Sequence, residues 1–192
     1  MSSKEIQKKA VPCYLFGKQE AKKQNRRDRV IKRELLFSKM KPHDYAEIIT
    51  FLGQKMEEQG YVKPTYVPAV LEREKGFPTG LQMGDYGIAI PHTDRVHVHQ
   101  SALAIATLKE PIEVCSMINP EEKVHVSLVI LMAVEDPDGQ VKMLSKLMGL
   151  FQDVETLKRL ERVSSTEEIR GWLREPVSWG QHQQKKCVIQ GS

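Results

Sequence analysis

The sequence predicts an α/β sandwich in which helices flank a mixed β-sheet. Three observations support this fold class. The patterns along the chain read as one strand, two helices, several strands and three further helices. The run from Val124 to Val134 is almost continuously apolar, which is typical of a strand that is buried on both faces. With 40% hydrophobic residues, the chain of 192 residues can bury a core of this kind.

The first half of the chain predicts one strand followed by two helices. Residues 30–37 mix apolar and charged side chains and predict the first strand. Pro42 stands at a first-turn position of a helix that Gly60 closes, and a second helix begins near Pro64 and ends at Gly76. The apolar residues of the first helix recur at helical spacing: Tyr45, Ile48, Ile49, Leu52 and Met56.

The second half of the chain predicts most of the sheet and three more helices. Residues 76–81 are rich in turn formers and predict a loop. Ser165 and Glu168 have the spacing of a capping box, so a last helix should begin there and end before Pro176. The other predicted elements are strands at 88–90, 102–108, 112–117 and 124–134, and helices at 140–151 and 154–160.

The positive charge of the chain is concentrated near its N-terminus. Residues 1–33 hold eleven basic and three acidic residues, a net charge of +8, whereas the remainder has a net charge of −4. We therefore expect a basic, poorly ordered extension at 1–28, one domain at 29–175 and a loose tail at 176–192. A basic extension either contacts an anionic partner or is simply solvated. The body has no basic stripe interleaved with aromatics, which argues against a nucleic-acid-binding domain.

The cysteines and the hydropathy indicate a cytoplasmic protein. Cys13, Cys115 and Cys187 are too scattered for a metal or redox motif, so they read as free thiols in a reducing compartment. No apolar run approaches the roughly 20 residues of a membrane helix. These features favour a cytoplasmic protein without a metal or organic cofactor.

The first candidate for chemistry is His92. It follows the apolar run Ile88–Ile90 and Pro91, which lacks an N–H and ends the strand ladder. A histidine at the end of a rigid strand is held in a fixed place, where its imidazole can act as a base, a ligand or a nucleophile. The alternative is a histidine that merely caps the strand.

The residues around His92 resemble a known family. The run from Gly84 to His92 reads Gly-Asp-Tyr-Gly-Ile-Ala-Ile-Pro-His, and Arg73-Glu74-Lys75 and Thr79 precede it. Together with the Met143–Asp153 helix, these residues resemble the enzyme IIA domain of the fructose/mannitol type in the bacterial sugar phosphotransferase system. The galactitol-specific branch is the most similar, and the resemblance covers roughly residues 30–173.

The resemblance implies a fold and an activity. The fold would be the α/β sandwich of the mannitol/fructose-type enzyme IIA. His92 would accept a phosphoryl group on Nε2 from the phosphorylated carrier protein HPr and pass it to a cysteine of enzyme IIB. Enzyme IIB would phosphorylate the sugar as the membrane component IIC imports it. A neutral imidazole nitrogen suits this exchange, because it is a good nucleophile and its phosphoramidate readily gives the group away.

The resemblance also implies roles for three further residues. Arg73 would balance the phosphate charge through paired N–H bonds, although its spacing alone favours an exposed charge at a helix end. Thr79 would offer its hydroxyl to the phosphate, or it is an ordinary turn residue. Gln140 occupies the position where many relatives carry a second histidine; it can form hydrogen bonds but cannot take up a proton.

Some alternatives stay open. His97 and His99 would share one face of a strand and bind a metal with a third ligand, or they line a polar strand edge. His125 begins the long apolar strand and could meet His92 in space. The domain as a whole could also be a regulatory relative that signals after phosphorylation, or a binding module without phosphotransfer.

Overall fold

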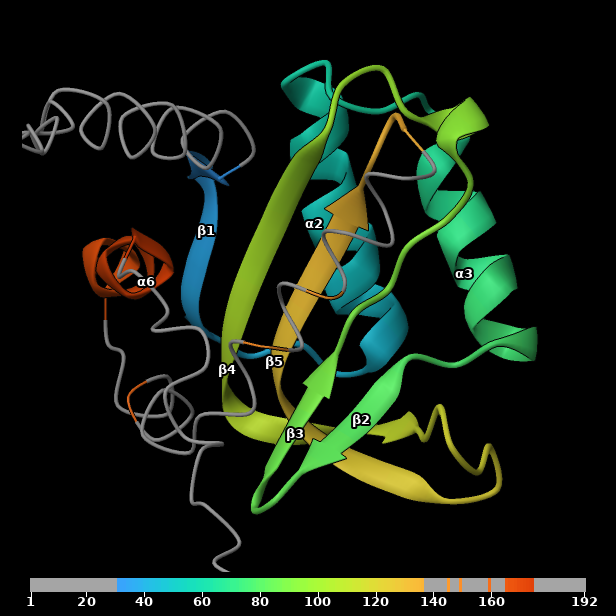
Figure 1. The fold of residues 1–192 in the computed structure, drawn as a ribbon, viewed down its shortest axis with the longest axis vertical. Helices are drawn as coiled ribbons and strands as arrows, with labels where there is room; N and C mark the ends of the chain where they lie inside the picture. The colour runs from blue at the N-terminus through green and yellow to red at the C-terminus, as the bar shows by residue number, and fades with distance from the viewer. Residues whose placement is uncertain (1–30, 137–144, 146–148, 150–158, 160–164, 175–192) are drawn as a thin grey trace, which may run out of the picture.

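The computed structural model describes residues 31–136, 145, 149, 159 and 165–174, and within them the sheet is mixed, as predicted (Figure 1). Its strand order is β1-β4-β5-β3-β2. β1 runs parallel to β4 and β3 runs parallel to β5, while β4 pairs with β5 and β2 pairs with β3 in antiparallel fashion. The strands are β1 Ile31–Met40, β2 Gly80–Met83, β3 Tyr86–Ala89, β4 Ala102–Cys115 and β5 Lys123–Ala133.

Helices cover both faces of this sheet. α2 (Tyr45–Glu58) and α3 (Tyr66–Gly76) lie together on one face, and α6 (Thr166–Arg174) lies beside β1 (Figure 1). Ile169 of α6 is fully buried in a hydrophobic cluster that is separate from the cluster under α2 and α3. The predicted sandwich is therefore confirmed.

β5 is the central strand and is buried on both faces, as its composition predicted. Val129 and Leu131 belong to the cluster beneath α2 and α3. Ile130 and Met132 belong to the cluster on the opposite face. The alternation of a strand sends neighbouring side chains to opposite faces, so a strand between two cores must be apolar at every position.

The strands predicted at 102–108 and 112–117 are one strand, β4. Its pairing with β5 is interrupted between Thr107 and Ile112, where five steps along β4 correspond to two along β5. Pro111 falls in this interruption, and a bulge tolerates a residue that cannot donate to the ladder. The prediction of two strands was wrong because a proline within a bulge resembles a proline that ends a strand.

The predicted loop at 76–81 extends too far along the chain, because β2 begins at Gly80. β2 and β3 form a hairpin in which Met83 pairs with Tyr86, which leaves Gly84 and Asp85 as the two loop residues. Gly84 has a φ of +58°, a backbone conformation that glycine adopts without strain. A strand of four residues next to a glycine-rich turn gives too little periodicity to detect.

α2 and α6 begin at residues whose side chains cap the helix. α2 begins after Asp44, whose carboxylate accepts the Glu47 N–H at 2.8 Å, and not at Pro42. The capping box at α6 is confirmed, because Ser165 and Glu168 exchange two hydrogen bonds of 3.3 Å. The helices predicted at 140–151 and 154–160, and both predicted terminal segments, fall largely or wholly outside the described residues.

β3 and β5 approach each other so closely that only glycine fits at position 87. A Cβ built on Gly87 would lie 2.1 Å from the His125 carbonyl oxygen and 2.6 Å from its carbon. Gly87 faces Val126 in the parallel ladder, and this ladder leads the chain toward His92. The fit of β3 against the central strand therefore sets where His92 lies.

We expect Gly87→Ala to lower the free energy of unfolding by about 2–3 kcal/mol, because the added methyl group meets backbone that cannot move aside. Gly171→Ala is the matched control, since Gly171 is exposed on α6 and nothing lies within 4 Å of its Cβ position. There alanine should stabilise by up to about 1 kcal/mol. Urea denaturation of both variants measures the difference, and equal stabilities would contradict the close approach.

Candidate functional site

His92 lies immediately beyond β3 and is held against β5. The Met132 N–H donates to the Pro91 carbonyl at 3.0 Å, and His92 forms an isolated parallel bridge with Met132. Tyr66 of α3 is fully buried, and its hydroxyl donates to the Met132 carbonyl at 2.8 Å. The backbone that carries the imidazole is thus tied to the central strand, which in turn is tied to α3.

One hydrogen bond orients the imidazole. His92 Nδ1 lies 2.9 Å from the Ile90 carbonyl oxygen. A carbonyl only accepts, so Nδ1 must carry the proton and donate. In the neutral ring, Nε2 then has the free lone pair. This arrangement leaves Nε2 as the nucleophilic atom of the site.

The surroundings favour the neutral imidazole. Burial lowers the pKa of His92 from its usual value, and the positive charge of Arg73 lowers it as well. The hydrogen bond to Ile90 and the negative charge of Asp94 act in the opposite direction but do not outweigh the burial. At neutral pH the ring is therefore uncharged, and its lone pair is available for nucleophilic attack.

Arg73 lies in the last turn of α3, and its charge reaches His92. Its side chain is half-buried, with the guanidinium carbon 5.8 Å from the centre of the Phe77 ring. The neighbouring cation Lys75 instead pairs with Glu72 at 2.7 Å on the exposed side of the helix. The positive charge of Arg73 thus acts on the His92 ring, and both are residues that the sequence singled out.

Thr79 is buried at the start of β2 and its hydroxyl is already engaged. It donates to Glu74 Oε1 at 2.7 Å, and its N–H donates to Glu74 Oε2 at 3.1 Å. The Tyr45 hydroxyl lies 3.1 Å from the same Thr79 oxygen. The phosphate contact expected of Thr79 therefore stays a prediction, while its contacts in this structure are with Glu74 and Tyr45.

Sequence reasoning missed Glu74 and Tyr45 as parts of this site. Glu74 lies in a run of residues of alternating charge that follows Leu71, and such a run predicts side chains exposed to solvent. A signal was nevertheless present, because Tyr66, Val70 and Glu74 recur every four residues and so share one face of α3. Tyr66 and Val70 are fully buried, which predicts that the next position on this face is partly buried too.

The other candidate residues lie elsewhere. Gln140 falls outside the described residues. His125 lies seven residues before Met132 on β5, roughly 23 Å away along an extended strand, so it does not meet His92. His97 lies in a short 3-10 helix (Arg95–His97), not on a strand, and its Nδ1 lies 2.8 Å from the Thr65 hydroxyl.

Within the described residues, no group of three or more His, Cys, Asp or Glu side chains is arranged to hold a metal ion. No described helix is long and apolar enough to cross a membrane.

The fold and the site define an α/β sandwich that presents one neutral, oriented histidine beside an arginine at a strand end. The chain belongs to the family described as "Phosphoenolpyruvate-dependent sugar phosphotransferase system, EIIA 2", whose model matches residues 29–186. The resemblance seen in the sequence is therefore confirmed at the level of the family.

Three relatives illustrate the range of this family. The galactitol-specific EIIA component of Escherichia coli K12 is 32% identical over 124 residues, which are 65% of this chain and 82% of that protein. The transcriptional regulator ManR of Bacillus subtilis is 34% identical over 130 residues, which are 67% of this chain but 18% of that protein. The mannitol enzyme IIA of Escherichia coli, solved in complex with phosphorylated mannitol enzyme IIB, superposes with a TM-score of 0.64 and 26% identity. That superposition covers 75% of this chain and 98% of the solved chain.

We expect His92 to titrate below its ordinary pKa of about 6.5 when its ring resonances are followed by NMR. The unfolded chain then binds the proton more readily than the native one. His92 therefore leaves stability unchanged above about pH 6.5 and reduces it as the pH falls below that value. His92→Asn should lack this loss between pH 7.5 and 5.5. A titration midpoint at or above 6.5 would contradict the buried, neutral ring.

Proposed function

We propose that this protein is a phosphocarrier of the sugar phosphotransferase system, of the galactitol or a related sugar-alcohol type. His92 accepts a phosphoryl group from phosphorylated HPr and passes it to a cysteine of enzyme IIB. The observation that carries this proposal is the hydrogen bond from His92 Nδ1 to the Ile90 carbonyl, which leaves Nε2 free. Membership of the family and the similarity to a galactitol-specific EIIA component support it.

The transfer follows from the chemistry of the ring. The Nε2 lone pair attacks phosphorus as the nitrogen–phosphorus bond of the donor histidine breaks, and the proton stays on Nδ1, which continues to donate to the Ile90 carbonyl. In the second transfer, a thiolate attacks and the Nε2–phosphorus bond breaks, so the ring returns to its neutral state. The transition state is loose, and the protein mainly positions groups and balances charge.

Arg73 supplies the charge balance. A phosphoryl group brings about 1.5 to 2 negative charges to the ring. The Arg73 guanidinium is near enough to influence the pKa of His92, and its fork of N–H donors suits phosphate oxygens. Asp94 acts on the same ring with a negative charge. Opposite charges acting on one ring suit a group that must be accepted and then released.

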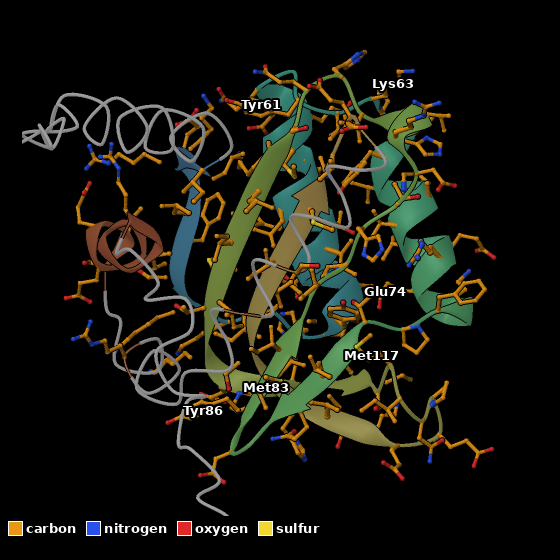
Figure 2. The ribbon with its side chains drawn as sticks, in the orientation of Figure 1. Tyr61, Lys63, Glu74, Met83, Tyr86 and Met117 are labelled. Atoms are coloured by element: carbon orange, nitrogen blue, oxygen red, sulfur yellow. The ribbon has the colours of Figure 1, made fainter. Side chains whose placement is uncertain are left out.

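Exposed apolar side chains near the site fit a protein partner. Phe77 is 70% exposed beside Arg73, and Ile118 is 82% exposed in the turn between β4 and β5. This turn lies against the start of β2, because the Met117 N–H donates to the Gly80 carbonyl at 2.7 Å (Figure 2). Exposed apolar side chains favour contacts with a protein partner, which supports a carrier protein docking on this surface.

A regulatory role is the second candidate, and the similarity to ManR favours it. A domain like this one occurs there within a much longer transcriptional regulator. In that role, phosphorylation of His92 would signal instead of supplying sugar uptake. Transfer from the phosphorylated protein to an enzyme IIB separates the two roles, because only the transport component needs that step.

We expect wild-type protein to gain one phosphoryl group when it is incubated with phosphoenolpyruvate, enzyme I and HPr, and His92→Ala to gain none. His97→Ala is the control, because His97 contacts Thr65 away from the site. Intact-mass spectrometry under non-acidic conditions counts the group, since phosphohistidine is acid-labile. A folded wild-type protein that stays unmodified beside an active HPr would overturn the carrier role, and a phosphorylated His92→Ala would place the group elsewhere.

A further inference from the structure

The carboxylate of Glu74 closes the loop between α3 and β2. It accepts both the N–H and the hydroxyl of Thr79, five residues further along the chain, at 3.1 and 2.7 Å. Figure 2 shows Glu74 at the end of α3 that leads into β2. Two hydrogen bonds to one ionised side chain are strong and directional. They hold residues 77–79 in a fixed turn.

This turn contains Phe77, whose ring lies next to the Arg73 guanidinium. The Phe77 N–H donates to the Arg73 carbonyl at 2.8 Å, and the Phe77 ring lies 5.8 Å from the Arg73 guanidinium carbon. Phe77 is otherwise largely exposed, so packing alone does not fix its ring. If the turn opened, Arg73 would lose its aromatic neighbour and gain rotamer freedom.

Glu74 is an uncommon choice for a purely structural clamp. Burial raises its pKa from the usual value, although the bonds from Thr79 and Tyr45 and the charge of Arg73 offset part of this effect. These four groups, the Thr79 amide and hydroxyl, the Tyr45 hydroxyl and Arg73, are the ones that face the carboxylate among the described residues. A neutral residue at a helix end would avoid the cost of burying a charge.

We propose that Glu74 is a positioning residue for phosphoryl transfer at His92: its carboxylate closes the 77–79 turn, and the closed turn holds the Arg73 guanidinium beside the imidazole. This inference rests on the proposed phosphocarrier function. The carboxylate neither contacts the ring nor receives the phosphoryl group. It acts on the reaction through Arg73, which balances the incoming charge.

Glu74→Gln tests this role because it keeps the size of the side chain but leaves one acceptor oxygen for two donors. We expect kcat/KM for transfer from phosphorylated HPr to fall about tenfold, as misplaced groups commonly cost that much or more. Glu72→Gln is the matched control, with the same substitution and charge change on the same helix. Glu72 is exposed and pairs with Lys75 alone among the described residues, so the rate of Glu72→Gln should stay within about twofold of wild type.

A double-variant cycle separates positioning from a general loss of structure. Arg73→Ala should itself slow transfer, and adding Glu74→Gln to it should cost little more, because the effect of Glu74 passes through Arg73. Full additivity of the two losses, or a Glu74→Gln protein as fast as Glu72→Gln, would overturn the proposal. Wild-type protein that takes up no phosphoryl group would instead overturn the phosphocarrier function on which this proposal rests.

A second measurement does not require Glu74→Gln to fold. In His92→Asn, which lacks the titrating ring, the Thr79 amide and the Arg73 Nε–H resonances are followed by NMR as the pH is lowered. A protonated Glu74 can no longer accept both Thr79 bonds. We expect the two resonances to shift with one common midpoint. An Arg73 resonance that stays unchanged through the Thr79 transition would overturn the link between the clamp and Arg73.

Discussion

The parallel contact between β5 and the segment that follows β3 is the constraint on which the site depends. β3 ends at Ala89, yet the chain does not leave the central strand, because the Met132 N–H reaches the Pro91 carbonyl. The ring of His92 then turns back to the Ile90 carbonyl. Both bonds use the carbonyls of two consecutive residues, Ile90 and Pro91, so the position of the imidazole and its tautomer are set by the same short stretch of chain.

The charges around this ring are arranged by secondary structure rather than by pairing with one another. Arg73 comes from the last turn of α3, where a cation is also favoured by the helix dipole. Asp94 directly precedes the short 3-10 helix, two residues after His92. The half-buried carboxylate of Glu74, the residue after Arg73, bonds to Thr79 and forms no ion pair with Arg73. The guanidinium thus remains available to an incoming anion.

Much of this arrangement was predictable from the sequence, and the failures have physical causes. The apolar run of β5 predicted a central strand, and Pro91 before His92 predicted a histidine at a strand end. β2 was missed because four residues beside a glycine turn carry almost no period. Glu74 was missed because its neighbours are charged, whereas its burial comes from Tyr45 and Thr79, which only the tertiary fold brings together. The contact of Arg73 with Phe77 depends likewise on a turn whose shape local sequence does not determine.

The central claim is that His92 carries its proton on Nδ1 and leaves Nε2 free. Long-range proton–nitrogen NMR on the imidazole of the wild-type protein, at a pH where the ring is neutral, tests it most directly. The hydrogen bond to the Ile90 carbonyl predicts a protonated Nδ1 and an Nε2 with the shift of an unprotonated nitrogen. A ring protonated on Nε2 instead would contradict this account, because the atom proposed as the phosphoryl acceptor would then lack its lone pair.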